Sequence, residues 1–173
     1  KNGRLINPSE NLDKVMDIFV EDGIIKEKAE SIEKQADTVI DAAGCYVMPG
    51  LIDLHVHFRD PGLTYKEDIE TGSKAAAKGG FTTVCCMPNT KPVVDNVETV
   101  KYIIEKGEKT GLTNVLPVGA VTKNMAGVEI TDVEELKKAG ICAISEDGKS
   151  VMNSGVYRKA MKNAAKANVP VLA

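Results

Sequence analysis

The chain has 173 residues, of which 43% are hydrophobic and 27% are charged, and its formal net charge is -3. This composition is ordinary for a folded protein and argues against intrinsic disorder. The small negative charge offers no basic surface for nucleic acid, so no nucleic-acid partner is expected. No apolar run approaches the ~20 residues that a membrane helix needs, and nothing resembles a signal peptide, so we predict a cytoplasmic protein without a membrane contact.

Residues 1–48 are expected to form a small antiparallel β domain. An Asp22-Gly23 pair after Glu21 is typical of a tight hairpin turn between two strands. These strands are too short to build a good core of their own. The predicted strands cover residues 4–6, 16–20, 24–26 and 38–40.

Residues 49–173 show a different period, in which apolar strands alternate with amphipathic helices, as parallel βα units do. No Gly-x-Gly-x-x-Gly loop follows a strand, which disfavours a dinucleotide-binding fold. We therefore predict the first half of a (β/α)8 barrel, cut off at its C-terminal end. Predicted helices cover 65–78, 131–139 and 154–168, and another follows Asp95 and carries apolar residues from Val97 to Ile104 on its inner side. Asp95, Thr131 and Ser154 are the expected caps. Predicted strands cover 50–58, 81–87, 114–121, 141–145 and 169–173.

The four cysteines, Cys45, Cys85, Cys86 and Cys142, lie in or beside apolar segments and lack the paired spacing of a zinc knuckle. We interpret all four as reduced residues of the core. Because side chains alternate along a strand, Cys85 and Cys86 should point to opposite faces of the sheet.

Polar residues gather where the predicted strands end. His55, His57 and Arg59 alternate with apolar residues, so they should share one face, and these two are the only histidines in the chain. Two imidazoles on one face can share a cation, although a strand-end His-x-His pair is more often only hydrogen-bonded or exposed. Asn89 ends the second barrel strand, and Glu146 and Asp147 end the fourth. Each of these is also a common turn residue, and spacing does not choose between Glu146 and Asp147.

The run from Gly50 to Gly62, which contains His-Val-His-Phe-Arg-Asp-Pro-Gly, closely resembles the type I dihydroorotases of the amidohydrolase superfamily. Met87-Pro88-Asn89-Thr90 and Ser145-Glu146-Asp147-Gly148 carry the same resemblance, which extends over essentially the whole chain. It implies a partial, TIM-like metal-dependent hydrolase barrel, preceded by the N-terminal part of a small β-sandwich domain.

The resemblance also implies roles for these residues. His55, His57 and Asp147 would bind one or two zinc ions, and His57, Arg59 and Asn89 would contact the substrate. The implied reaction interconverts N-carbamoyl-L-aspartate and dihydroorotate in pyrimidine synthesis. A homodimer and an association with aspartate carbamoyltransferase are the protein partners that it implies.

One expectation concerns what is missing. The family places two further histidines and a general-base aspartate after a strand like residues 169–173, so the 173 residues alone should be inactive. An open half-barrel should also expose inner positions such as Leu51, Val84 and Val118 and require a covering segment or chain. Two rival functions remain open: a hydantoinase or allantoinase, and a non-catalytic scaffold for aspartate carbamoyltransferase.

Overall fold

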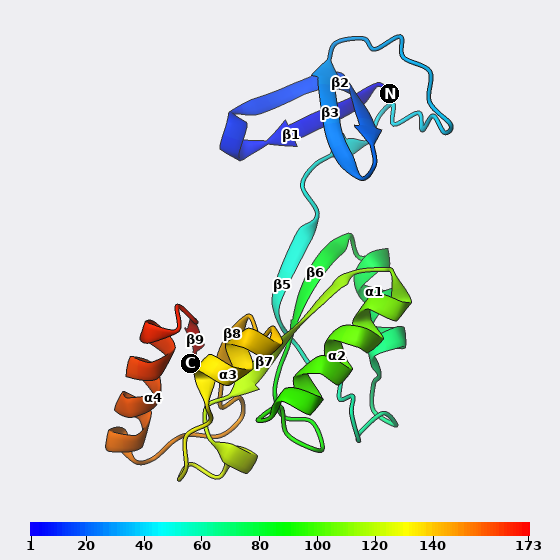
Figure 1. The fold of residues 1–173 in the computed structure, drawn as a ribbon. Helices are drawn as coiled ribbons and strands as arrows, with labels where there is room; N and C mark the ends of the chain where they lie inside the picture. Colours follow the sequence, from blue (N-terminus) through cyan, green and yellow to red (C-terminus); the bar gives the residue numbers. More distant parts are fainter. The chain divides into compact units, whose positions relative to one another are not determined.

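The computed structural model describes residues 1–173, which divide into two compact units, Lys1–Pro49 and Gly50–Ala173 (Figure 1). The first unit is all β apart from one short 3-10 helix, and the second is α/β. The predicted α/β class with a preceding antiparallel β segment is confirmed. No helix in the structure has the length and apolarity to cross a membrane.

The first unit is a four-stranded sheet in the order β3-β2-β1-β4. Strands β1, β2 and β3 are antiparallel neighbours, and β4 pairs in parallel with β1. The predicted hairpin turn is confirmed between β2 and β3, where Asp22 and Gly23 both have positive φ. The elements are β1 (Gly3–Asn7), η1 (Pro8–Glu10), β2 (Leu12–Glu21), β3 (Ile24–Ala29) and β4 (Tyr46–Val47).

Two predictions for this unit were wrong. Residues 38–40 form no strand; Val39 and Ile40 are exposed in an irregular segment. The apolar run lacked a neighbouring strand to pair with, and tertiary context overrode its β propensity. Cys45 is exposed rather than part of the core, because it lies in the turn before β4.

Asp17 is the buried carboxylate of the first unit. It accepts hydrogen bonds from the Lys1 Nζ at 2.9 Å, the Asn2 backbone N–H at 2.9 Å and the Ile32 backbone N–H at 3.0 Å. The hydrogen bond from Lys1 is the largest of the contributions that lower the pKa of Asp17 well below its usual range. A buried charge is tolerated here because all its contacts are donors.

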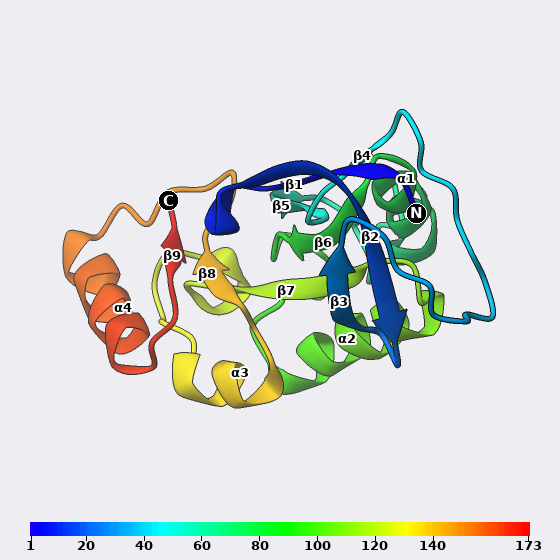
Figure 2. The ribbon, with the colours of Figure 1, turned by 90° about the horizontal axis from the view of Figure 1, so that it is seen from above.

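The second unit is a curled sheet of five parallel strands in the order β5-β6-β7-β8-β9, so the predicted succession of βα units is confirmed. Its strands are β5 (Leu51–Val56), β6 (Phe81–Cys86), β7 (Asn114–Ala120), β8 (Ala143–Ser145) and β9 (Val171–Leu172). Its helices are α1 (Ile69–Lys78), α2 (Val97–Thr110), η2 (Lys123–Met125), α3 (Val133–Ala139) and α4 (Ser154–Lys166). Figure 2 shows the four α-helices along the outside of the curled sheet.

Helices α1, α2 and α3 begin later than predicted and α4 is capped one residue earlier; the caps of α2, α3 and α4 are each next to the residue we expected. Asn96, Asp132 and Asn153 are the N-caps, in place of Asp95, Thr131 and Ser154, and α1 begins at Ile69 after the cap Asp68 rather than at residue 65. Tertiary hydrogen bonds explain two of the shifts. Thr131 donates its hydroxyl to the Ala120 carbonyl at 2.7 Å, and Asp95 accepts from the Asn124 backbone N–H at 2.7 Å.

The two faces of the sheet form two apolar clusters. The larger one packs helix residues such as Ile69, Val100 and Leu136 against outward-facing strand residues, including Val84 and Cys86. The smaller one lies on the inner face and contains Cys85, Met87, Val118 and Ala143. The opposite orientation of Cys85 and Cys86 is thereby confirmed.

The prediction that the open half-barrel exposes Val84 and Val118 was wrong. Val84 faces the helices and is 1% exposed, while Val118 is covered by its inner-face neighbours and is fully buried. Exposure concentrates instead on β5, which has a strand partner on one side only. Leu51, Ile52 and Leu54 are all exposed there.

Candidate active site

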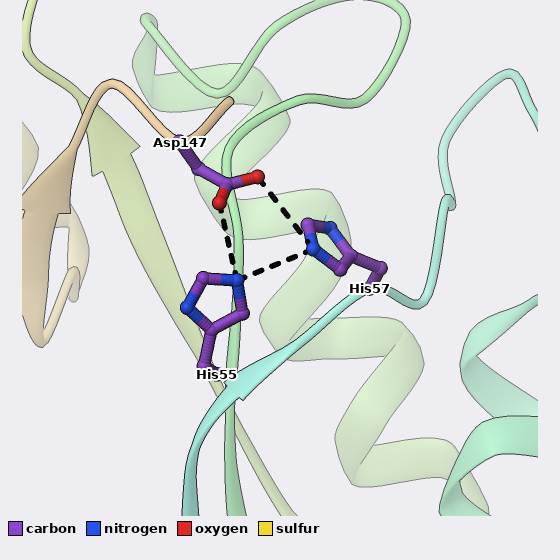
Figure 3. Close-up of side chains that lie close together, drawn as sticks. All are labelled: His55, His57 and Asp147. Atoms are coloured by element: carbon purple, nitrogen blue, oxygen red, sulfur yellow. Dashed lines mark hydrogen bonds and ion pairs between the residues drawn. The ribbon is translucent and has the colours of Figure 1, made fainter. Parts of the chain in front are cut away.

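The two histidines lie at the carboxyl end of β5: His55 is its second-last residue, and His57 directly follows it. Asp53 pairs with Val84 and Val56 pairs with Cys86, so β5 contains one extra residue in a bulge. The Asp53 carboxylate accepts the His55 backbone N–H at 3.0 Å within this bulge. The bulge ends at Val56, and the side chains alternate from His55 onward: Val56 and Phe58 pack into the helix-side core, while His55 and His57 turn toward each other (Figure 3).

Asp147, in the loop after β8, completes a cluster with the two histidines (Figure 3). The Nε2 atoms of His55 and His57 are 3.3 Å apart. Asp147 Oδ1 lies 3.1 Å from Nε2 of His55, and its Oδ2 lies 3.6 Å from Nε2 of His57. Ligand atoms around a tetrahedral zinc ion, at ~2.0–2.1 Å from the metal, are separated by about 3.3 Å. The three donor atoms therefore have the spacing and the chemistry of a zinc site.

The structure distinguishes Asp147 from Glu146, which the sequence did not. The Glu146 carboxylate is buried and accepts the Thr122 backbone N–H at 3.0 Å and the Thr122 hydroxyl. Glu146 thus ties the loop after β7 to the end of β8. Asp147 is the carboxylate that reaches the histidines.

Asn89, after β6, links the cluster to Arg59. Its Oδ1 lies 3.0 Å from Nδ1 of His57 and accepts a hydrogen bond from Nη1 of Arg59 at 3.1 Å, and its Nδ2 donates to Oδ2 of Asp147. A proton on Nδ1 of His57 would satisfy this contact and leave the Nε2 lone pair directed at the other two donors. The structure therefore brings all five predicted site residues together.

Three residues that shape this site were not predicted from the sequence. Asp53 bonds the His55 backbone within the bulge of β5, Thr122 holds Glu146 away from the histidines, and Asp60 anchors the segment that follows Arg59. Asp60 alone carried a sequence signal, since it belongs to the Arg-Asp-Pro-Gly run. The other two depend on strand register and on a contact between loops, which a single sequence does not reveal.

A cavity of about 360 Å³ opens beside His55 and Asp147, and the loop after β8 forms much of its wall. Tyr157 and Leu172 also line it. A larger hollow of about 820 Å³ lies between α3 and α4 and contains none of the site residues. The smaller cavity gives access to the side of the candidate metal site that His55 and Asp147 form.

Sequence comparison finds close relatives along the whole chain. It is 48% identical over 173 residues to the dihydroorotase of Pelobacter propionicus, covering 99% of this chain and 41% of that protein. It is 51% identical over 172 residues to the dihydroorotase of Aquifex aeolicus, with the same two coverages. The chain thus spans about two fifths of the length of the relatives that it matches.

Structural comparison finds solved structures that match nearly the whole chain. An L-hydantoinase from Arthrobacter aurescens matches with a TM-score of 0.78 and 26% identity, over 99% of this chain and 39% of that one. A D-hydantoinase from Thermus sp. matches with a TM-score of 0.75 and 28% identity, over 99% and 38%. These neighbours have the amidohydrolase barrel fold, and the curled sheet is the corresponding half-barrel.

A family model described as "Dihydro-orotase-like" matches residues 44–173, which include every residue of the candidate site. The match agrees with the whole-chain similarity to proteins named dihydroorotase. This chain belongs to the dihydroorotase-like family of amidohydrolases.

Proposed function

We propose that this protein is a zinc-dependent amidohydrolase that interconverts N-carbamoyl-L-aspartate and dihydroorotate, a step of pyrimidine synthesis in the cytoplasm. The observation that carries the proposal is the convergence of three metal-ligand atoms with an Arg59–Asn89 pair at the carboxyl ends of parallel strands. Barrel enzymes place their active sites at this end of the sheet.

In this proposal His55, His57 and Asp147 hold the metal. A zinc ion bound there supplies Lewis-acid polarisation of an amide carbonyl and activation of a water molecule. Asn89 fixes the positions of three site residues relative to one another, because it contacts His57, Arg59 and Asp147. The general base would be the aspartate that the family places in the part of its sequence not spanned by these 173 residues.

Arg59 is the proposed clamp for the substrate carboxylate, with Asn89 and His57 beside it. A guanidinium offers five donors in a planar fork, which pairs with a carboxylate through two parallel hydrogen bonds. One donor atom, Nη1, contacts Asn89, and the other donors are left for a ligand. Dihydroorotate carries a ring amide and a carboxylate, so it matches both the metal site and the clamp.

A hydantoinase or allantoinase is the second candidate function, favoured by the structural similarity to hydantoinases. Hydantoin and allantoin lack the ring carboxylate that Arg59 would bind. The relatives named dihydroorotase are also nearer in sequence, at 48% and 51% identity against 26% and 28%. Both arguments favour dihydroorotate as substrate.

A non-catalytic scaffold for aspartate carbamoyltransferase is the third candidate. It would not require three donor atoms to stay within zinc-binding distance, so the intact cluster argues for catalysis. We also propose a homodimer, an association with aspartate carbamoyltransferase, and a division of the chain into two domains. In that division residues 1–48 are the N-terminal part of a small β-sandwich, and residues 49–173 are the first half of the catalytic barrel.

Ring opening of dihydroorotate, hydantoin and allantoin by the zinc-loaded full-length gene product tests these candidates. We expect turnover of dihydroorotate alone, loss of that turnover in Asp147→Asn, and retention in Asp132→Asn, which alters only the exposed cap of α3. Turnover of hydantoin without dihydroorotate would favour the second candidate. Zinc content near zero with no turnover would favour the third. A chain ended at Ala173 should be inactive, because it lacks the proposed general base.

A further inference from the structure

We infer that Asp60 is a positioning residue that holds Arg59 at the substrate carboxylate. The inference rests on the proposed function, because it needs Arg59 to bind that carboxylate. Asp60 touches neither the candidate metal ligands nor Asn89, and its part in the site is indirect.

Asp60 is one of the most buried charged residues in the chain, at 2% exposure. Its Oδ2 accepts from Lys106 Nζ at 2.6 Å and from the Ile69 backbone N–H at 3.3 Å. Its Oδ1 accepts the Tyr102 hydroxyl at 2.9 Å. Both carboxylate oxygens are therefore bonded to donors on the first residue of α1 and on α2. The segment after β5 is fixed to two helices at the residue that follows Arg59.

Arg59 needs such support because its backbone has φ of +57°, which is uncommon for a residue other than glycine. Strained conformations persist where the surroundings over-determine them. On its N-terminal side, buried Phe58 packs so closely over Gly72 that a Cβ there would lie 2.4 Å from the ring. On its C-terminal side, Asp60 supplies the anchor. The left-handed turn thus lies between two fixed points.

The Arg59 side chain itself has few restraints, since its one hydrogen bond goes to Asn89. The direction of the guanidinium therefore depends on the position and conformation of the Arg59 backbone. The same segment also holds the Asn89 loop, because the Pro61 carbonyl accepts the Lys91 backbone N–H at 3.0 Å. A shift at Asp60 would move both residues of the proposed clamp together.

A purely structural role for Asp60 is the alternative, and Asp17 provides a matched control for it. Asp17 is equally buried and also accepts from one lysine and from backbone N–H groups, but it belongs to the other unit and contacts no residue of the site. Replacement of either aspartate should lower the melting temperature. Only Asp60 should change substrate affinity.

The experiment compares wild type, Asp60→Asn, Arg59→Lys, the double variant and Asp17→Asn in the zinc-loaded full-length protein. Asparagine keeps the shape of the side chain and removes the charge that Lys106 and Tyr102 bond. We expect Asp60→Asn to raise KM for dihydroorotate about tenfold, the effect of weakening a hydrogen bond to a charged group, with kcat within about twofold. Zinc content should be unchanged. In the Arg59→Lys background the same change should raise KM by less than about twofold, because effects that act through one residue do not add.

Three results would overturn the inference. Asp60→Asn could lower the melting temperature without changing KM, as Asp17→Asn should. Its effect on KM could persist undiminished in the Arg59→Lys background, or it could come with a loss of zinc.

If Asp60→Asn does not fold, Tyr102→Phe removes one of the same hydrogen bonds and should raise KM about threefold, again only when Arg59 is present. A wild type without dihydroorotate turnover, or an Arg59→Lys variant with normal KM, would instead defeat the proposed function.

Discussion

Replacement of Arg59 by lysine should separate the substrate clamp from the metal site. The guanidinium uses Nη1 for Asn89, at 3.1 Å, and offers its remaining donors to the ligand as a planar fork. Lysine keeps the positive charge but presents a single point, so at least one charge-assisted hydrogen bond to the carboxylate is lost. Such a bond contributes ~1.5–3 kcal/mol. That range corresponds to a fall in kcat/KM of about 10- to 150-fold.

Steady-state ring opening of dihydroorotate measures this fall, with bound zinc determined on the same samples. Zinc content should not change, because Arg59 supplies none of the three donor atoms of the cluster. Arg158→Lys is the matched control, since Arg158 lies exposed on α4 and should show wild-type kinetics. If Arg59→Lys removes the zinc while turnover per bound zinc stays normal, Arg59 supports the metal site and does not hold the substrate.

Three further predictions concern the cluster, the buried ion pair and the thiols. Asp147→Asn should weaken zinc binding by more than the ~10–100-fold typical of outer-shell changes, as measured by competition with a chelator. Lys106→Met should lower the free energy of unfolding by about 1–3 kcal/mol at pH 7, measured in urea. Its bond to Asp60 raises the pKa of Lys106 above the usual 10.5, so this difference should be complete below pH 10.5 and shrink as pH rises through the higher folded-state value. A maleimide should label exposed Cys45 in the native protein, whereas Cys86, whose thiol pKa is raised by burial, should react only after unfolding, as peptide mapping would show.

The sequence was sufficient for the order of elements in the second unit. Its apolar strands and amphipathic helices differ in the period of their hydrophobic residues, and this difference reveals the order of the elements. Cap residues were less predictable, because Asp95 and Thr131 are good caps by type and the structure uses both for bonds to other loops. At α2 and α3 the sequence places the helix start to within one or two residues, and tertiary hydrogen bonds of Asp95 and Thr131 decide which residue is the cap.

The strand predicted at residues 38–40 was wrong for a related reason. A short apolar run predicts a strand only if another strand lies alongside to accept its backbone hydrogen bonds, and sequence alone does not show that neighbour. The prediction that Val84 faces the inside of the barrel was wrong because the sequence alone does not show which residues of β6 point inward. In the structure it is Cys85 that faces inward, so its neighbour Val84 packs against the helices.

The choice between Glu146 and Asp147 shows why a site can be located from sequence without being resolved. Both carboxylates follow β8, and either could reach the end of β5 in an extended chain. Thr122, on the loop after β7, distinguishes the two. Its backbone N–H and its hydroxyl both donate to the Glu146 carboxylate and hold it at that loop, away from the histidines. With that carboxylate satisfied, the next residue in the chain turns toward His55 and His57. The same logic applies at β5, where Asp60 is held by α1 and α2 and leaves Arg59 facing the site. In each pair, the residue that is fully bonded within the fold sets the direction of the neighbour that is free to bind.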